Sequence, residues 1–196
     1  MSSYDALAAS YDALTVDVEY RRRADYLTRQ FHRSALPVET VLDLACGTGT
    51  MACLLAERGY RMIAVDGSEE MLTQAAWKAA ALEQPPMFLH QSMPRLHLGM
   101  EVDAAISTLD ALNYLTRTAD LRETLRRVYR WLRPGGLFLF DVNTPKAPAD
   151  GRAGLSGRDR GQLLRLADLL RPRPEDLHLS GGPVPAERQR ELGPGL

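Results

Sequence analysis

The chain has 196 residues, with 24 Lys and Arg against 25 Asp and Glu, and 45% of its residues are hydrophobic. This length suits one α/β domain with a real core and is too short for two ordinary domains. The near-zero net charge and the lack of a basic stripe beside aromatic residues exclude an obvious nucleic-acid partner. No apolar run reaches membrane-spanning length and no apolar leader is present, so the sequence predicts a cytoplasmic protein without a membrane partner.

The two cysteines, Cys46 and Cys53, do not have metal-ligand spacing, and we interpret them as packing residues in a reducing compartment. No metal site is predicted. Residues 4–31 alternate apolar and polar side chains at helical spacing, which predicts two helices before the first strand. The triplet at 21–23, all arginine, is interpreted as a solvated helix face.

The most informative stretch begins with the apolar run Val41–Leu44, which predicts a buried strand. It enters a glycine turn containing Gly47 and Gly49, and apolar residues at helical spacing follow from Met51. This order of strand, glycine loop and helix is typical of a nucleotide-binding βα unit, in which glycines let backbone N–H groups approach a ligand. Alone it is weak evidence, because unrelated loops share it.

Asp43 makes this pattern more specific, since it lies in the strand just before the glycine turn. A carboxylate there repels a pyrophosphate and attracts an ammonium group, which favours a ligand with a cationic amino acid end. The motif Asp-x-Ala-x-Gly-x-Gly resembles that of the class I S-adenosylmethionine-dependent methyltransferases, where this loop holds the methionine part of the cofactor. The alternative for Asp43 is a strand-end cap.

A second apolar strand at 62–65 ends in Asp66, 17 residues beyond Gly49. Doubly wound folds place an acid near this distance to accept hydrogen bonds from ribose hydroxyls. The alternative is a helix N-cap, although Ser68 is the better N-cap of the helix that follows, which is predicted to run to about Leu82.

Further strands are predicted at 87–90, 102–106 and 137–142, with an amphipathic helix at 121–132. The segment Leu-Arg-Pro-Gly-Gly-Leu at 132–137 is a strong mark of the same family, and the resemblance covers residues 4–145. It implies an α/β Rossmann-like three-layer sandwich with a mostly parallel sheet in the order 3-2-1-4-5.

The resemblance also implies which residues surround the cofactor. Ser92 departs from the acidic residue usual in relatives near the adenine amine. The alternatives are packing for Tyr11, Met71 and Tyr114, and helix capping for Asp110. Asp110, Asn113 and Tyr114 could also orient a substrate. The cofactor-binding residues predicted are Tyr11, Asp43, Gly47, Gly49, Asp66, Ser68, Met71, Ser92, Met93, Leu109 and Asp110.

Residues 146–196 form a second region of low complexity. They contain no Phe, Tyr, Trp, Ile, Met or Thr, and Val184 is the only β-branched residue, which predicts disorder apart from one short helix at 162–170. Residues 145–171 can be back-translated with permitted codons and read one base out of phase. The resulting sequence has alternating aromatic and β-branched residues, as in a β-strand. We therefore hypothesise a frameshift near codon 145, which the gene sequence can test.

The closing antiparallel strands of the family are then expected to be missing, leaving the edge of the fifth strand open to self-association. The predicted function is methyl transfer from S-adenosylmethionine to an undetermined small-molecule acceptor, with no catalytic base nominated. The alternatives are a cofactor-binding remnant without turnover and an NAD-dependent oxidoreductase, for which Gly47, Gly49 and Asp66 are also suitable.

Overall fold

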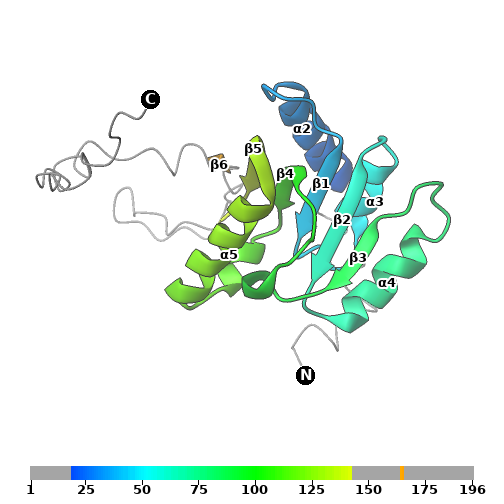
Figure 1. Cartoon of the computed structure of the whole chain (residues 1–196). Coiled ribbons are helices and arrows are strands. Elements are labelled where there is room, and N and C mark those ends of the chain that lie inside the picture. The colour runs from blue at the N-terminus through cyan, green and yellow to red at the C-terminus, as the bar shows by residue number, and fades with distance from the viewer. Residues whose placement is uncertain (1–18, 143–163, 166–196) are drawn as a thin grey trace, which may run out of the picture.

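The structure, a computed structural model, describes residues 19–142 and 164–165 (Figure 1). The first predicted helix, Tyr11 and most of the region 146–196 lie outside the described residues. The helices are α2 (Tyr20–His32), α3 (Thr50–Ala56), α4 (Glu69–Ala79) and α5 (Thr118–Trp131), with 3-10 turns η1 (Met93–Arg95) and η2 (Ala111–Tyr114). The strands are β1 (Thr40–Leu44), β2 (Arg61–Asp66), β3 (Met87–His90), β4 (Val102–Ser107), β5 (Leu132–Phe140) and β6 (Leu164–Arg165).

One sheet organises the described chain, in the order β3-β2-β1-β4-β5-β6. Strands β1 to β5 are parallel, which confirms the predicted order 3-2-1-4-5. Helices α2 and α3 cover one face and α5 covers the other (Figure 1). Because both faces are covered, all five residues of β1 are buried, as expected for a central parallel strand.

The last strands differ from the prediction. Strand β5 begins at Leu132, not at Leu137, and its register against β4 shifts between Val102 and Ala104 because the Pro-Gly-Gly segment inserts extra residues. A two-residue antiparallel strand, β6, pairs with β5 at Leu139 and Phe140. One closing strand is therefore present at 164–165, where the sequence predicted part of a short helix.

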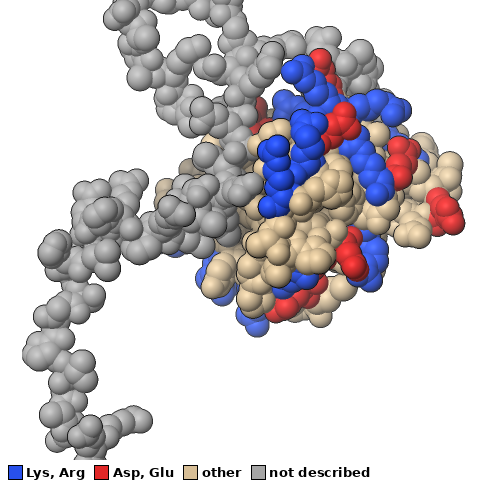
Figure 2. Space-filling view, turned by 90° about the horizontal axis from the view of Figure 1, so that it is seen from above, with Lys and Arg blue, Asp and Glu red and all other residues tan. Residues whose placement is uncertain are grey.

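Charged side chains of both signs are intermixed on the surface. Seen from above, basic side chains gather over one part of the molecule and acidic side chains lie among them (Figure 2). Ion pairs of this kind join Arg61 to Glu39 at 3.2 Å and Arg133 to Asp103 at 3.0 Å. Among the described helices, none is both long and apolar enough to cross a membrane.

Candidate functional site

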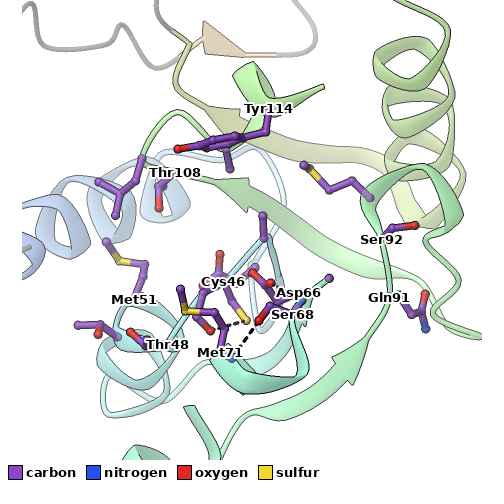
Figure 3. A pocket seen from close by; sticks show the side chains of 18 of the residues that line it. Cys46, Thr48, Met51, Asp66, Ser68, Met71, Gln91, Ser92, Thr108 and Tyr114 are labelled. Carbon is purple, nitrogen blue, oxygen red and sulfur yellow. Dashed lines mark hydrogen bonds between the residues drawn. The ribbon is translucent and has the colours of Figure 1, made fainter. Parts of the chain in front are cut away.

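A cavity of about 430 Å³ opens at the carboxyl ends of β1, β2 and β4, where open α/β sheets bind ligands. Its volume lies in the range of small-molecule sites. Figure 3 shows Tyr114 on one side of it and Asp66, Ser68 and Met71 on the opposite side, with Gln91 and Ser92 on the loop after β3. The predicted residues that line it are Asp43, Gly47, Asp66, Ser68, Met71, Ser92, Met93 and Leu109.

Asp43 is the most unusual of these side chains. Its residue is only 1% exposed, and its Oδ2 has no hydrogen-bond partner. Burial first, and the nearby carboxylate of Asp66 second, together raise the pKa of Asp43 to about 7. A buried acceptor without a partner costs free energy, so this oxygen is suited to a donor arriving from the cavity.

Asp66 has a different environment at the end of the adjacent strand. Its Oδ2 accepts a hydrogen bond from the Gly47 backbone N–H at 2.8 Å, and its Oδ1 accepts one from the Ser68 N–H at 2.9 Å. The carboxylate thus fastens the glycine loop to β2. Each oxygen still has a second lone pair that could accept a hydroxyl proton.

The two glycines of the loop differ in what surrounds them. Gly47 lines the cavity and has a φ of +54°, and a Cβ there would have no atom within 4 Å. Gly49 has a φ of +72°, and its Cβ would lie 2.8 Å from the Cβ of Ala75. Gly49 does not line the cavity; it allows the loop to pack closely against α4.

Two segments form the wall that the resemblance assigns to the adenine. Ser68 caps α4 by accepting a hydrogen bond from the Met71 N–H at 3.2 Å, which confirms the predicted cap. Ser92 and Met93 lie in the turn after β3. The indole N–H of Trp131 holds the end of this turn by donating to the Leu96 carbonyl at 3.4 Å.

The opposite wall follows β4, and it is hydrogen-bonded to a carboxylate that the sequence did not predict as part of the site. Leu109 lines the cavity, whereas Asp110 does not. The backbone N–H groups of both donate to the carboxylate of Asp141, at 3.1 and 2.9 Å. Arg23 also donates to Asp141 at 3.1 Å, so the arginine triplet is not simply a solvated face.

Asp141 could have been found by the signal that identified Asp43 and Asp66, an acid at the end of a buried parallel strand. Other cavity residues not predicted as ligands carry no such signal. Tyr20 comes from α2, and Gln91 and Thr108 follow strands. Tyr114, 62% exposed, borders the cavity, whereas Asn113 is not among the residues that line it.

Residues 41–136 match a family model described as a methyltransferase domain. The putative methyltransferase YqeM of Bacillus subtilis is 38% identical over 142 residues, which cover 72% of this chain and 56% of YqeM. The glycine/sarcosine N-methyltransferase of Aphanothece halophytica is 33% identical over 103 residues, covering 52% of this chain and 39% of that protein.

Solved structures give the same result. An S-adenosylmethionine-dependent methyltransferase from Clostridium acetobutylicum superposes with a TM-score of 0.65 at 31% identity, covering 73% of this chain and 58% of that one. The sugar N-methyltransferase KedS8 from a Streptoalloteichus species gives a TM-score of 0.63 at 26% identity, covering 72% and 57%. The chain thus spans a little over half the length of YqeM and of these two structures.

Proposed function

The chain belongs to the class I S-adenosylmethionine-dependent methyltransferase family, and we propose that it transfers the methyl group of this cofactor to a small-molecule acceptor. S-adenosylmethionine is the cofactor of the family. The observation that carries the proposal is that Asp43 and Asp66, from adjacent strands, line one cavity. Two acids so placed can bind opposite ends of one ligand.

The site fits this cofactor at its amino acid end. The unpartnered Oδ2 of Asp43 is buried in the cavity wall, and a ligand ammonium would supply the missing donor. Gly47 offers open space beside it, since no side-chain atom occupies the position of a Cβ. We assign Asp43 and Gly47 to the methionine part of the cofactor.

The adenosyl end is assigned to the neighbouring strands. Asp66 would accept hydrogen bonds from the ribose hydroxyls through its remaining lone pairs. Met71 and Met93 would pack against the adenine, and Ser92 would hydrogen-bond its edge. Leu109 then lies on the side where the methyl group is transferred.

A sulfonium is already an activated methyl donor, so the protein's main task is to align the acceptor with the methyl group and exclude water. No general base is required by this chemistry when the acceptor is neutral and nucleophilic. Tyr20 and Tyr114 border the cavity and could contact such an acceptor. Because two of the relatives above are N-methyltransferases of small molecules, small amines are the first acceptors to test.

The alternatives make different predictions. A cofactor-binding remnant would bind S-adenosylhomocysteine without transferring a methyl group to any acceptor. An oxidoreductase would bind NADH, but the relatives named above are methyltransferases and do not favour this reading. The cytoplasmic location and self-association through the edge of β5 stay predictions.

The test is calorimetric titration of the full chain with S-adenosylhomocysteine, with NADH as the matched control. We expect one site for S-adenosylhomocysteine and none for NADH. Binding of NADH alone would contradict the proposed cofactor. Transfer of a labelled methyl group to a panel of small amines then separates the enzyme from the remnant.

A further inference from the structure

Asp141 lies directly after β5, outside the set of residues that line the cavity, yet it contacts two of the segments that form the cavity wall. We propose that Asp141 is a positioning residue, which holds Leu109 in place and fastens α2 to the same point through Arg23. The effect on ligand affinity rests on the proposed function, whereas the effect on the loop does not.

The carboxylate of Asp141 is buried, with 2% of the residue exposed, and three donors converge on it. Its Oδ2 accepts from the Leu109 N–H at 3.1 Å and from Nη1 of Arg23 at 3.1 Å, and its Oδ1 accepts from the Asp110 N–H at 2.9 Å. The Asp141 backbone N–H in turn donates to the Ser107 carbonyl at 3.2 Å. Asp141 is thus hydrogen-bonded to the last residue of β4 and to two residues of the turn that follows it.

This turn has a conformation that its residues do not favour. Leu109 has a φ of +62° and Asp110 a φ of +61°, two consecutive non-glycine residues in the left-handed region. Such residues persist only when their surroundings hold them. The two hydrogen bonds from their N–H groups to one carboxylate supply that restraint.

Arg23 extends the connection to α2. Tyr20 lies three residues earlier on this helix, so Tyr20 and Arg23 lie on one helix face. Tyr20 lines the cavity as Leu109 does, and Arg23 donates to the carboxylate that holds Leu109. A single buried carboxylate therefore sets the position of two walls of one site.

The chain offers a matched control for this ion pair. Arg22 is the next residue of the helix, and its partner is the exposed Glu19 at 2.9 Å, where both side chains are about two-thirds exposed. The side chain of Arg23 is 37% exposed, so its loss should not prevent folding. Arg22→Met and Arg23→Met are thus the same substitution at neighbouring positions, and they remove different ion pairs.

The experiment compares wild type, Asp141→Asn, Arg23→Met and Arg22→Met in the full chain. Hydrogen exchange of the Leu109 and Asp110 amides should become at least tenfold faster in Asp141→Asn. The affinity for S-adenosylhomocysteine should fall about tenfold in Asp141→Asn and about threefold in Arg23→Met. Arg22→Met should match wild type in both measurements.

A rescue separates positioning from general destabilisation. Asp110→Gly accepts the left-handed conformation without strain, so the double variant Asp141→Asn with Asp110→Gly should recover affinity to within threefold of wild type. Unchanged exchange in Asp141→Asn, or failure of the glycine to restore affinity, would overturn the proposal. If wild type itself does not bind S-adenosylhomocysteine, the proposed function fails, while the exchange measurement still decides whether Asp141 holds the loop.

Discussion

The two ends of the sheet use aspartate in opposite ways. At the start of β4, Asp103 accepts hydrogen bonds from the Glu39 and Thr40 N–H groups, both at 2.8 Å, and pairs with Arg133 at 3.0 Å. At the end of β1, the more deeply buried Asp43 has an Oδ2 without a hydrogen-bond partner. The first carboxylate is satisfied by the protein, and the second is not.

This difference shows why an acid beside a strand does not by itself identify a site. Asp103 joins two strands and is structural. Asp43 retains an unsatisfied oxygen in a cavity wall and is suited to a ligand. Asp66 combines the two roles, since it fastens the glycine loop and also faces the cavity.

The largest expected effect comes from Asp66→Ala, compared with Asp103→Ala. Both variants remove a carboxylate that accepts two backbone N–H groups, so both should lower the free energy of unfolding. Only Asp66→Ala should weaken S-adenosylhomocysteine binding, by about 100-fold, because hydrogen bonds to a charged group contribute about 1.5–3 kcal/mol each. Equal affinities in the two variants, measured by calorimetry, would remove the distinction between the ends of the sheet.

A smaller effect on affinity is expected from Asp43→Asn, together with a gain in stability. At pH 8 the variant should bind S-adenosylhomocysteine about tenfold more weakly, because it cannot form a charged pair with the ammonium group. The ligand-free variant should unfold at higher denaturant concentration than wild type. The rise of the Asp43 pKa from 3.8 to about 7 on folding lowers the free energy of unfolding of the wild type by about 4 kcal/mol at this pH.

The size of this stability difference depends on pH. The pKa of Asp43 is higher in the folded protein than in the unfolded chain, so wild-type stability falls as pH rises from about 4 to 7. The difference between variant and wild type should therefore vanish near pH 4. Affinity should show the reverse trend in wild type, weakening below pH 7 as the carboxylate is protonated. A flat wild-type binding profile would argue against an ionised Asp43 in the complex.

The smallest effects should separate the two glycines. Gly49→Ala should lower the free energy of unfolding by about 1–3 kcal/mol, because its Cβ would lie too close to Ala75 and its φ is positive. Gly47→Ala has only the backbone strain to overcome, but its methyl group would enter the cavity. We expect it to cost less stability and more affinity, as measured by denaturant unfolding and calorimetry.

Local sequence patterns were sufficient to predict the five parallel strands. Continuous apolar runs identified the strands, and the acids predicted at the ends of β1 and β2 both line the cavity. These features depend on residues close together in the chain. The family resemblance supplied the strand order.

Features that depend on distant residues could not be predicted in the same way. Arg23 and Asp141 are 118 positions apart, and no local pattern pairs them. The close contact of Gly49 with Ala75 depends on how α4 packs, and β6 pairs through its backbone in a region of low β-propensity. Tertiary structure, not local preference, decides these positions.

The central claim is that Asp43 and Asp66 bind opposite ends of one ligand. The most direct test measures S-adenosylhomocysteine and methylthioadenosine, which lacks the amino acid, against both variants. We predict that Asp66→Ala weakens binding of both compounds, whereas Asp43→Asn weakens only S-adenosylhomocysteine. Equal loss of both compounds in Asp43→Asn, or of neither, would contradict this account.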